Sequence, residues 1–340
     1  MVRIAVFGAG AIGCWVGGRL AAHADVTLIG RPRVLDELRA GVRTTDLDGV
    51  DVSAIAAIAT DAAAAATADV VLVTVKSAQT ADAGAALAPH VRADTAVVSL
   101  QNGVRNARTL QAALPGRRVL PGMVQYNVIR KAPAHYHRAT EGQLMFGHDS
   151  APPSGGARDP SAPLARACAD AGLAYTVRTD MAAVLWSKLL LNLGNAVNAL
   201  CGLPLVEELS QRAFRLVMAA CQREALALLA AAREPIAKLI AVPPRWMPRV
   251  LALPDAVFRP LAKRMIGVDP TARSSMWADL EAGRATEVDF LQGEIVGLAD
   301  RLGRAAPVNR AIADLVHAAE RGGRRDFRGD ELLALAVAGR

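Results

Sequence analysis

An apolar segment that runs into a glycine-rich turn near the start of the chain limits the possible folds more than any other feature. Residues 5–33 read AVFGAGAIGCWVGGRLAAHADVTLIGRPR. The pattern G-x-G-x-x-G follows a predicted strand, opens a predicted helix and precedes a second strand by about one βα unit; it consists of Gly8, Ala9, Gly10, Ala11, Ile12 and Gly13. This context predicts a βαβ unit that binds a dinucleotide.

Each glycine of the motif has its own predicted task. Gly8 permits a tight turn, Gly10 lets the backbone approach a pyrophosphate at the helix N-terminus, and Gly13 allows close packing of the helix on the strand. Ala9, Ala11 and Ile12 complete the predicted cofactor loop. A glycine motif with a purely structural role is the alternative interpretation.

The charge at the end of the second strand indicates which dinucleotide binds. A site for NAD usually places Asp or Glu there for the ribose 2′-hydroxyl, whereas the 2′-phosphate of NADP needs cationic donors. This turn reads Gly30-Arg31-Pro32-Arg33 and contains no carboxylate. We therefore expect NADP(H), with Arg31 as the phosphate contact and Arg33 assisting it. A solvated loop arginine is the alternative.

The hydrophobic pattern divides the chain into two parts. Apolar β-branched runs alternate with alanine-rich helical stretches in the first part, and the predicted helices span residues 11–22, 32–40, 78–89 and 104–114. That alternation is typical of a parallel sheet covered on both faces. We also expect a short strand pair over residues 42–58, a β-ribbon or antiparallel addition around the KAPA sequence at 131–134, and a further strand at 174–179. Residues 150–163 are predicted to form a surface loop.

After Asp180 the pattern is almost continuously helical, so the predicted fold class is α/β with an all-α C-terminal domain. A Rossmann-type NADP-binding domain is assigned to residues 1–180 and a helical substrate and catalytic domain to residues 181–340. Seven prolines between residues 234 and 270 exclude one long helix there and predict short helical pieces. Whether these pieces form a lid, a dimer contact or a membrane-facing patch stays open.

Composition narrows the class of function. The 340 residues are 52% hydrophobic and 21% charged, which is typical of an ordinary globular protein. The net charge of +7 comes from scattered arginines, which favours small anionic ligands over nucleic acid. No signal peptide, membrane-spanning run or metal-ligand spacing is evident, so we expect a cytoplasmic enzyme that contains no metal and has reduced cysteines. A homodimer stays open.

Polar residues at two strand ends are candidates for the cofactor and substrate site. Lys76 closes the run DVVLVTVK, and Asn102 follows the strand TAVVSLQ in the turn Gln101-Asn102-Gly103. In open α/β sheets, ligands bind beyond the carboxyl ends of the strands. Each residue alone is also compatible with a purely structural role at the end of a strand or in a turn.

A polar stripe on an apolar helix supplies the candidate for proton transfer. Lys188, Asn192 and Asn195 follow i, i+4, i+7 spacing in VLWSKLLLNLGNAVNALCG and are expected on one helix face. Burial among leucines lowers the pKa of a lysine toward working pH, which suits a general acid. The alternative is a lysine that reaches solvent, with asparagines that bond neighbouring helices.

The segment SSMWADLEAGRATEVDFLQGEIVGLADRLG, residues 274–303, adds Ser275 and Glu287. Thr286 with Asp289 resembles a helix-capping pair, so Glu287 is equally interpretable as a first-turn acid favoured by the helix dipole.

Taken in order, the motifs GAGAIG, VK, QNGV, LWSKLLLN and SSMWADLEAGRATEVDFLQGEIVGLA resemble the ketopantoate reductase (2-dehydropantoate 2-reductase) family over nearly the whole chain. The resemblance implies NADPH-dependent reduction of a 2-oxo acid, namely 2-dehydropantoate to pantoate in pantothenate biosynthesis. It also implies that Lys188 is the catalytic lysine and that Glu287 supports it or the substrate hydroxyl, with Glu287 also near the cofactor. Ser275 takes the substrate carboxylate, and Asn102 and Asn192 line the site.

The sequence departs from the family pattern at one turn beyond Asn192. Ala196-Val197 stands where the family commonly has Asn-Pro, and Asn195 is adjacent. Asn195 is therefore a candidate replacement for the missing amide. A relative that acts on another 2-oxo or 2-hydroxy acid, and a non-catalytic NADP(H)-binding sensor, are the alternatives to the main interpretation.

Overall fold

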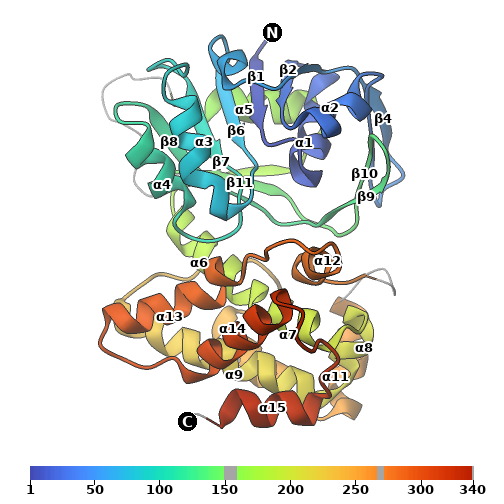
Figure 1. The fold of residues 1–340 in the computed structure, drawn as a ribbon, viewed down its shortest axis with the longest axis vertical. Helices are drawn as coiled ribbons and strands as arrows, with labels where there is room; N and C mark the ends of the chain where they lie inside the picture. The colour runs from blue at the N-terminus through green and yellow to red at the C-terminus, as the bar shows by residue number, and fades with distance from the viewer. Residues whose placement is uncertain (149–158, 266–271, 339–340) are drawn as a thin grey trace. The chain divides into compact units, whose positions relative to one another are not determined.

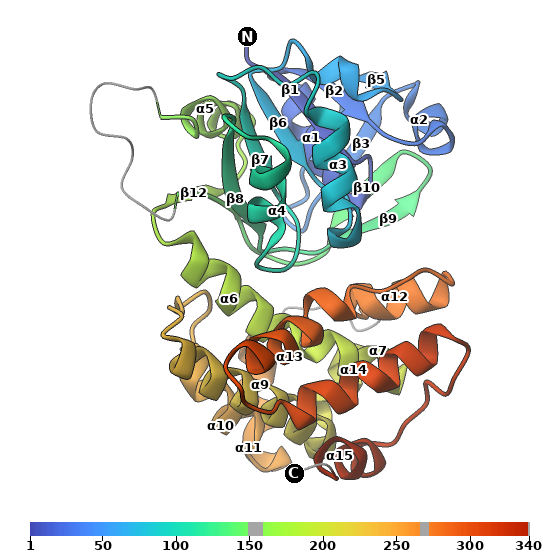
Figure 2. The same ribbon diagram turned by 60° about the vertical axis from the view of Figure 1, so that its left-hand side comes forward.

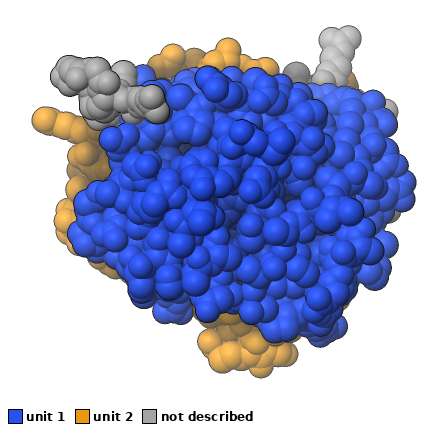
Figure 3. Space-filling view, turned by 90° about the horizontal axis from the view of Figure 1, so that it is seen from above, with its two compact units in different colours: residues 1–181 blue, residues 182–340 orange. Residues whose placement is uncertain are grey.

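The computed structural model describes residues 1–148, 159–265 and 272–338 (Figure 1). The chain divides into two compact units, Met1–Met181 and Ala182–Arg340, which are coloured separately in Figure 3. Much of the surface loop predicted for residues 150–163 lies outside the described residues, as do residues 266–270 of the proline-rich segment.

An eight-stranded sheet forms the centre of unit 1, in the order β12-β11-β8-β7-β6-β1-β2-β5. The five pairings from β5 to β8 are all parallel, β11 is antiparallel to β8, and β12 is parallel to β11. Strands β6 and β7 are buried at every position, as expected for β-branched strands covered on both faces. The strands are β1 Arg3–Phe7, β2 Asp25–Ile29, β5 Ala57–Ala59, β6 Val70–Val73, β7 Ala96–Ser99, β8 Arg118–Val124, β11 Leu144–Gly147 and β12 Tyr175–Arg178.

Helices cover both faces of this sheet, so the predicted α/β architecture is confirmed (Figures 1 and 2). One hydrophobic cluster joins the sheet to α1 Ala11–Ala21, α2 Pro32–Leu38 and α5 Ala162–Asp170. A second cluster joins the opposite face to η1 Ala62–Ala65, α3 Thr80–Leu87 and α4 Asn106–Ala113. The helices expected at 11–22, 32–40, 78–89 and 104–114 are all present within a few residues of their predicted ends.

A second sheet of four strands, in the order β4-β3-β10-β9, packs on α1. Its strands are β3 Val42–Thr45, β4 Asp51–Ala54, β9 Val128–Ala132 and β10 His135–Arg138. The two hairpins, β3–β4 and β9–β10, were predicted as a strand pair and a ribbon. Their parallel pairing through β3 and β10 was not predicted, because it joins segments about ninety residues apart.

Helix α1 is consequently held between the two sheets. A Cβ atom at Gly17 would lie 2.5 Å from the side chain of Leu28 in the large sheet, and one at Gly18 would lie 2.9 Å from Thr44 in the small sheet. Trp15 donates a hydrogen bond to the carbonyl of Thr45 at 3.0 Å. The small side chains of α1 therefore allow close packing on both of its sides.

The described residues of unit 2 form helices and no strand, as the sequence predicts. The long helix α9 packs against neighbours that include α7, α10, α14 and α15 (Figure 2). The elements are α6 Met181–Asn192, α7 Gly194–Cys201, α8 Leu205–Ser210, α9 Arg212–Ala232, η3 Pro244–Trp246, α10 Met247–Leu251, α11 Asp255–Met265, α12 Ser275–Glu281, η4 Val288–Phe290, α13 Gln292–Arg301, α14 Pro307–Glu320 and α15 Gly329–Val337.

The proline-rich segment consists of short helical pieces, which confirms that prediction. Arg215 of α9 is fully buried and anchors part of this segment. Its guanidinium donates to the carbonyls of Leu251 and Leu253 at 3.0 and 2.7 Å, and it forms an ion pair with Asp255 at 2.8 Å. Residues 247–255 are thus tied to the core of unit 2.

None of the helices in the described ranges is both long and apolar enough to cross a lipid bilayer. All four cysteines, which lie within those ranges, are buried thiols.

Candidate functional site

The glycine motif forms a loop between β1 and α1 in which the three glycines have different surroundings. Gly8 adopts φ +121°, and a Cβ there would lie 2.7 Å from the backbone nitrogen of Val75. A Cβ at Gly13 would lie only 2.1 Å from the carbonyl oxygen of Gly8. At Gly10, in contrast, no described atom outside the adjoining backbone lies within 4 Å of the Cβ position. The loop is therefore tightly packed on its inner side and open at Gly10.

The open side of the loop is the N-terminus of α1. Gly10 is the N-cap residue, and no side chain of the described chain caps the helix. The first backbone N–H groups of a helix lack intrahelical partners and, with the helix dipole, attract anions. Thr74 donates to the Gly8 carbonyl at 2.7 Å and holds the turn in place. Ala11 and Ile12, in the first turn, thus have the geometry that a pyrophosphate site needs.

Arg31 lies at the N-cap of α2, two residues beyond the end of β2, and its side chain is exposed. Among the described residues, Arg31 has no ion pair, although two acidic side chains follow it closely in the sequence. Asp36 is paired with Arg39 at 2.9 Å, and Glu37 is paired with Arg130 at 2.5 Å. The charge of Arg31 is therefore not compensated by the neighbouring carboxylates.

Lys76 and Asn102 occupy equivalent places on neighbouring strands. Val73 of β6 is paired with Ser99 of β7, and each candidate lies three residues further on. Both side chains are half-buried. Ser77 donates to the carbonyl of Asn102 at 2.8 Å and joins the two strand ends. The structure thus brings Lys76 and Asn102 to the same edge of the sheet, as predicted.

A buried polar network beneath these strand ends was not predicted from the sequence. Gln101 donates to the carbonyl of Val75 at 3.0 Å and to the hydroxyl of Thr80 at 2.7 Å, and Thr80 donates to Asn106 at 2.8 Å. Asn106 in turn donates to Ser77 at 3.2 Å. Buried polar groups that satisfy one another fix the backbone around them. The sequence did contain a signal for this network, namely polar residues that follow strands otherwise rich in alanine and valine.

Lys188 and Asn192 lie one turn apart on α6. Asn192 is buried, and Lys188 is partly buried among leucines. Burial lowers the pKa of the Lys188 ammonium from 10.5 to about 8. An amine with this pKa is mostly protonated at neutral pH and can still release its proton readily, which is what a general acid requires.

The helical segment expected over residues 184–202 is divided at Leu193, although Leu193 itself keeps helical dihedral angles (φ −58°, ψ −25°). Helix α6 ends at Asn192 and α7 begins at Gly194, so Asn195 belongs to a separate helix. Two backbone carbonyls at the interruption accept hydrogen bonds from side-chain amides. Gln222 donates to the carbonyl of Leu190 at 3.1 Å, and Gln292 donates to that of Leu193 at 2.8 Å. Lys188 and Asn192 therefore share α6, whereas Asn195 lies in the first turn of α7.

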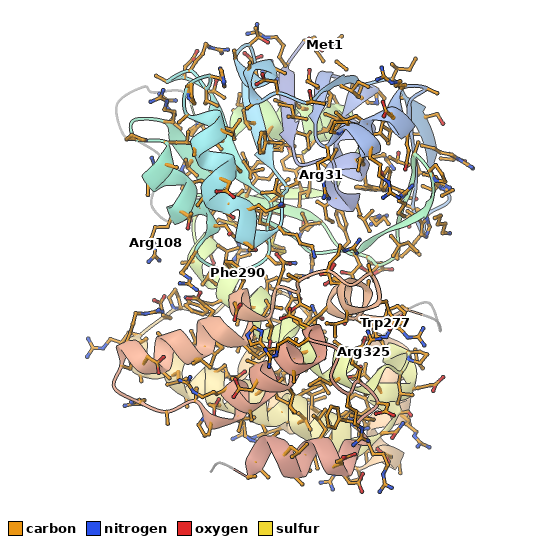
Figure 4. The ribbon with its side chains drawn as sticks, in the orientation of Figure 1. Met1, Arg31, Arg108, Trp277, Phe290 and Arg325 are labelled. Atoms are coloured by element: carbon orange, nitrogen blue, oxygen red, sulfur yellow. The ribbon has the colours of Figure 1, made fainter. Side chains whose placement is uncertain are left out.

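Ser274 and Ser275 have different roles at the start of α12. Ser274 is buried, accepts a hydrogen bond from the backbone of Trp277 at 3.1 Å and donates to the carbonyl of Asn195 at 3.0 Å. Ser275 is exposed, at the first helical position. Figure 4 marks Trp277 on this helix. Ser274 thus caps the helix, and Ser275 is presented at its N-terminus.

Buried groups behind this cap were not predicted. Asn198 accepts a hydrogen bond from the backbone of Ser274 at 2.8 Å and donates to Glu208 at 2.6 Å. Glu208 is fully buried, and this burial raises the pKa of its carboxyl to about 8.

Glu287 is half-buried and directly precedes η4, a single turn of three residues. The capping pair expected of Thr286 and Asp289 does not form, because Asp289 faces His317 at 3.0 Å. Thr286 caps alone: its hydroxyl accepts from the backbone of Val288 at 3.2 Å. Glu287 is not a side-chain cap of η4 in the described structure, and α13 starts only at Gln292. Glu287 therefore occupies the N-cap position of a single 3₁₀ turn and not the first turn of an α-helix.

Three elements of unit 2 meet at the interruption between α6 and α7. The cap of α12 is bonded to Asn195, at the start of α7, and Gln292, which follows the η4 turn, is bonded to Leu193. The elements that carry Asn192, Ser275 and Glu287 are thereby joined. In Figure 4, Trp277 and Phe290 mark the two attached segments, α12 and η4.

Comparisons with known proteins agree with this organisation. Residues 4–150 match the family model described as Ketopantoate reductase PanE/ApbA, and residues 180–320 match the model described as Ketopantoate reductase PanE/ApbA C terminal. A 2-dehydropantoate 2-reductase from Halobacterium salinarum is 31% identical over 95% of this chain and 100% of its own length.

Solved structures give the same result. A PanE/ApbA family ketopantoate reductase from Ralstonia eutropha JMP134 has a TM-score of 0.78 and 31% identity, over 94% of this chain and 99% of that one. A D-mandelate dehydrogenase in a ternary structure with NADH and anilino(oxo)acetate has a TM-score of 0.76 over 94% and 99% of the two chains. Its 18% identity supports a shared fold only.

Proposed function

Since the chain belongs to the ketopantoate reductase family, we propose that it reduces 2-dehydropantoate to pantoate with NADPH, the reductive step of pantothenate biosynthesis. The observation that carries this proposal is Lys188, a partly buried lysine whose pKa burial lowers to about 8, on a helix within the matched C-terminal region. Lys188 is the proton donor of the proposed reaction.

Unit 1 provides the groups for the cofactor. The backbone N–H groups of Ala11 and Ile12 would hold the pyrophosphate, and the open space at Gly10 would let it approach the helix N-terminus. Arg31 would pair with the 2′-phosphate, since the neighbouring carboxylates are already paired with other arginines. This choice of NADP(H) over NAD(H) rests on Arg31. Lys76 and Asn102 would face the nicotinamide end from the strand edge.

The chemistry needs one hydride and one proton. When bound, the reduced nicotinamide supplies the hydride to the ketone carbon. Lys188 polarises the ketone oxygen and donates a proton to it from Nζ, so that the carbonyl becomes a secondary alcohol and Lys188 is left neutral. Glu287 would orient Lys188 or accept a hydrogen bond from the substrate hydroxyl.

Polar groups on the joined elements of unit 2 would hold the substrate. Ser275, at the exposed N-terminus of α12, would bind the carboxylate, where the hydroxyl and the helix terminus both favour an anion. Asn192 and Asn195 would bind the hydroxyl groups. Positioning of this kind converts an encounter into a near-attack geometry and contributes much of the rate.

The alternative substrate is another 2-oxo acid, and the observation that favours it is the placement of Asn195 on α7, beyond the interruption at Leu193. A location in the cytoplasm and a homodimeric assembly remain predictions.

The test is the oxidation of NADPH by purified protein with a panel of 2-oxo acids. We expect turnover with 2-dehydropantoate, and slower turnover with 2-oxoisovalerate, which lacks the hydroxyl. Turnover of other 2-oxo acids but not of 2-dehydropantoate would show that the protein is a related reductase with a different substrate. NADPH binding without turnover of any substrate would identify a sensor and contradict the proposal.

A further inference from the structure

A cluster of four side chains joins the turn that carries Glu287 to helix α14. The carboxylate of Glu320, at the end of α14, accepts from the backbone nitrogen of Thr286 at 2.8 Å and from its hydroxyl at 2.7 Å. His317, one turn earlier on α14, faces Glu320 through Nδ1 at 2.9 Å and Asp289 through Nε2 at 3.0 Å. Thr286 and Asp289 flank Glu287 on its two sides, so both flanks of this residue are attached to α14.

The geometry requires a charged histidine. Both ring nitrogens of His317 face carboxylate oxygens, and only the imidazolium form has a donor on each nitrogen. The His317 side chain is 30% exposed, and burial acts to lower its pKa. The hydrogen bonds to Glu320 and Asp289, with their charges, outweigh this burial, so the pKa of His317 is raised above 6.5.

Carboxylates on the helices that pack against α14 are engaged elsewhere: Glu294 of α13 pairs with Arg301 at 3.6 Å, and Glu224 of α9 accepts from the N-terminus of α14. Asp300 of α13 pairs with Arg310 at 3.1 Å, about two helical turns from His317. Asp330 and Glu331 of α15 pair with Arg328 and Arg324. Asp289 from η4 and Glu320 from α14 are therefore the carboxylates that face His317 in the described structure.

Helix α14 is a rigid support for this cluster. Val308, Ile312 and Val316 are fully buried. The N-terminus of α14 is also fixed, because Glu224 of α9 accepts from the backbone nitrogens of Val308 and Asn309 at 3.0 and 2.9 Å. The turn η4 has only three residues, so its conformation depends on neighbouring elements. Hydrogen bonds to the fixed helix α14 restrict the motion of this turn.

We propose that His317 and Glu320 are positioning residues that hold the Glu287 turn in its working conformation, and that loss of the proton on His317 loosens this turn. The proposal rests on the proposed function only for the role of Glu287. His317 does not need to touch the substrate, because it acts through Asp289 and Glu320 on the backbone around Glu287. A general consequence is that catalysis should weaken above the pKa of His317 for a reason other than the titration of Lys188.

The direct test compares His317→Gln and Glu320→Gln with wild type in kcat, KM and the pH profile of kcat/KM. We expect about a tenfold or larger fall in kcat/KM, since a small misplacement of a catalytic group has effects of this size. His317→Lys retains a positive charge between the two carboxylates and should recover part of the loss. Asp314→Asn is the matched control, because it removes a carboxylate from the exposed side of the same helix and should leave kcat/KM unchanged.

A double-mutant cycle then tests whether the effect passes through Glu287. In a Glu287→Ala background, His317→Gln should have no further effect on kcat/KM, because the group that it positions is absent. Independent, multiplicative effects of the two substitutions would overturn the proposal.

Hydrogen exchange keeps the proposal testable even if the reaction is not the one proposed. The backbone amide of Thr286, which donates to Glu320, should exchange faster in His317→Gln than in wild type or Asp314→Asn. In wild type its protection should fall as the pH rises through the pKa of His317. Unchanged protection would overturn the proposal, whereas a wild-type protein inactive on 2-oxo acids with faster exchange in the variant would overturn the proposed function alone.

Discussion

Replacing Lys188 by methionine should make the protein more stable at neutral pH while it removes most of the activity. Methionine keeps the length and apolar stem of the side chain but has no charge to desolvate. The pKa of Lys188 is lowered from 10.5 to about 8. A difference of this size corresponds to at most about 3.5 kcal/mol of unfavourable free energy for the buried ammonium, at roughly 1.4 kcal/mol per pKa unit.

The pH dependence gives this prediction its sign. Below pH 8 the lysine is protonated in the folded and the unfolded chain, so the full cost of burying the charge is present. Between about pH 8 and 10.5 the unfolded chain binds more protons than the folded one, so the stability of the wild type rises with pH relative to Lys188→Met. The advantage of the variant is therefore largest at neutral pH and disappears near pH 10.5.

Denaturant unfolding of both proteins at several pH values measures this difference, because all other titrating groups are common to the two chains. Lys238→Met is the matched control, since Lys238 is an exposed lysine in the same unit. Its stability difference from wild type should vary little with pH. A Lys188→Met difference that is equally independent of pH would refute the reasoning.

Activity completes the same experiment. We expect kcat of Lys188→Met to fall by roughly two orders of magnitude or more, with NADPH affinity nearly kept, as for loss of a general acid. In wild type, kcat for ketone reduction should decline about tenfold per pH unit above pH 8, because the acid must be protonated. An unchanged kcat in the variant would exclude Lys188 as the proton donor.

Three further predictions concern the cofactor and the substrate. Arg31→Ala should weaken NADPH binding by about 1.5–3 kcal/mol and leave NADH binding nearly unchanged in fluorescence titrations, because a charge-assisted phosphate contact is lost; equal weakening of both would exclude Arg31. Gly10→Ala should keep the Tm and weaken both cofactors, whereas Gly13→Ala should lower the Tm, because its Cβ would lie 2.1 Å from the Gly8 carbonyl; a normal Tm for Gly13→Ala would contradict this. Wild type should prefer 2-dehydropantoate over 2-oxoisovalerate in kcat/KM by less than roughly 10⁴-fold, and Asn195→Ala should reduce the preference further; a larger wild-type preference would show that the amide of Asn195 is well placed.

The sequence predicts the large sheet of unit 1 well because its signals are local. Buried strands rich in valine alternate with alanine-rich helices, and the glycine motif marks the first turn. The small sheet depends instead on a parallel pairing between β3 and β10, whose register joins Arg43 to His135. Nothing in either short strand identifies its distant partner, so only the two hairpins could be predicted.

The candidate site shows the same limit. Lys188 and Asn192 follow helical spacing, and one turn of α6 holds both of them. At the interruption, the carbonyls of Leu190 and Leu193 accept from the amides of Gln222 and Gln292, which lie 29 and 99 residues beyond Leu193 along the chain. Likewise, Thr286 finds its partner on α14 instead of within its own turn. Helical periodicity contains no information about such distant hydrogen bonds.

The two halves of the predicted cofactor site differ in how freely they can change during evolution. Helix α1 is enclosed by two sheets, so a larger side chain would need a compensating change in the large sheet at Gly17 and in the small sheet at Gly18. The turn after β2 has no such constraint, because Arg31 and Arg33 are exposed. Under the proposed role of Arg31, a single substitution in that turn would alter the cofactor preference without destabilising the domain. In this fold, the choice of cofactor and the integrity of the domain can be inherited as separate traits.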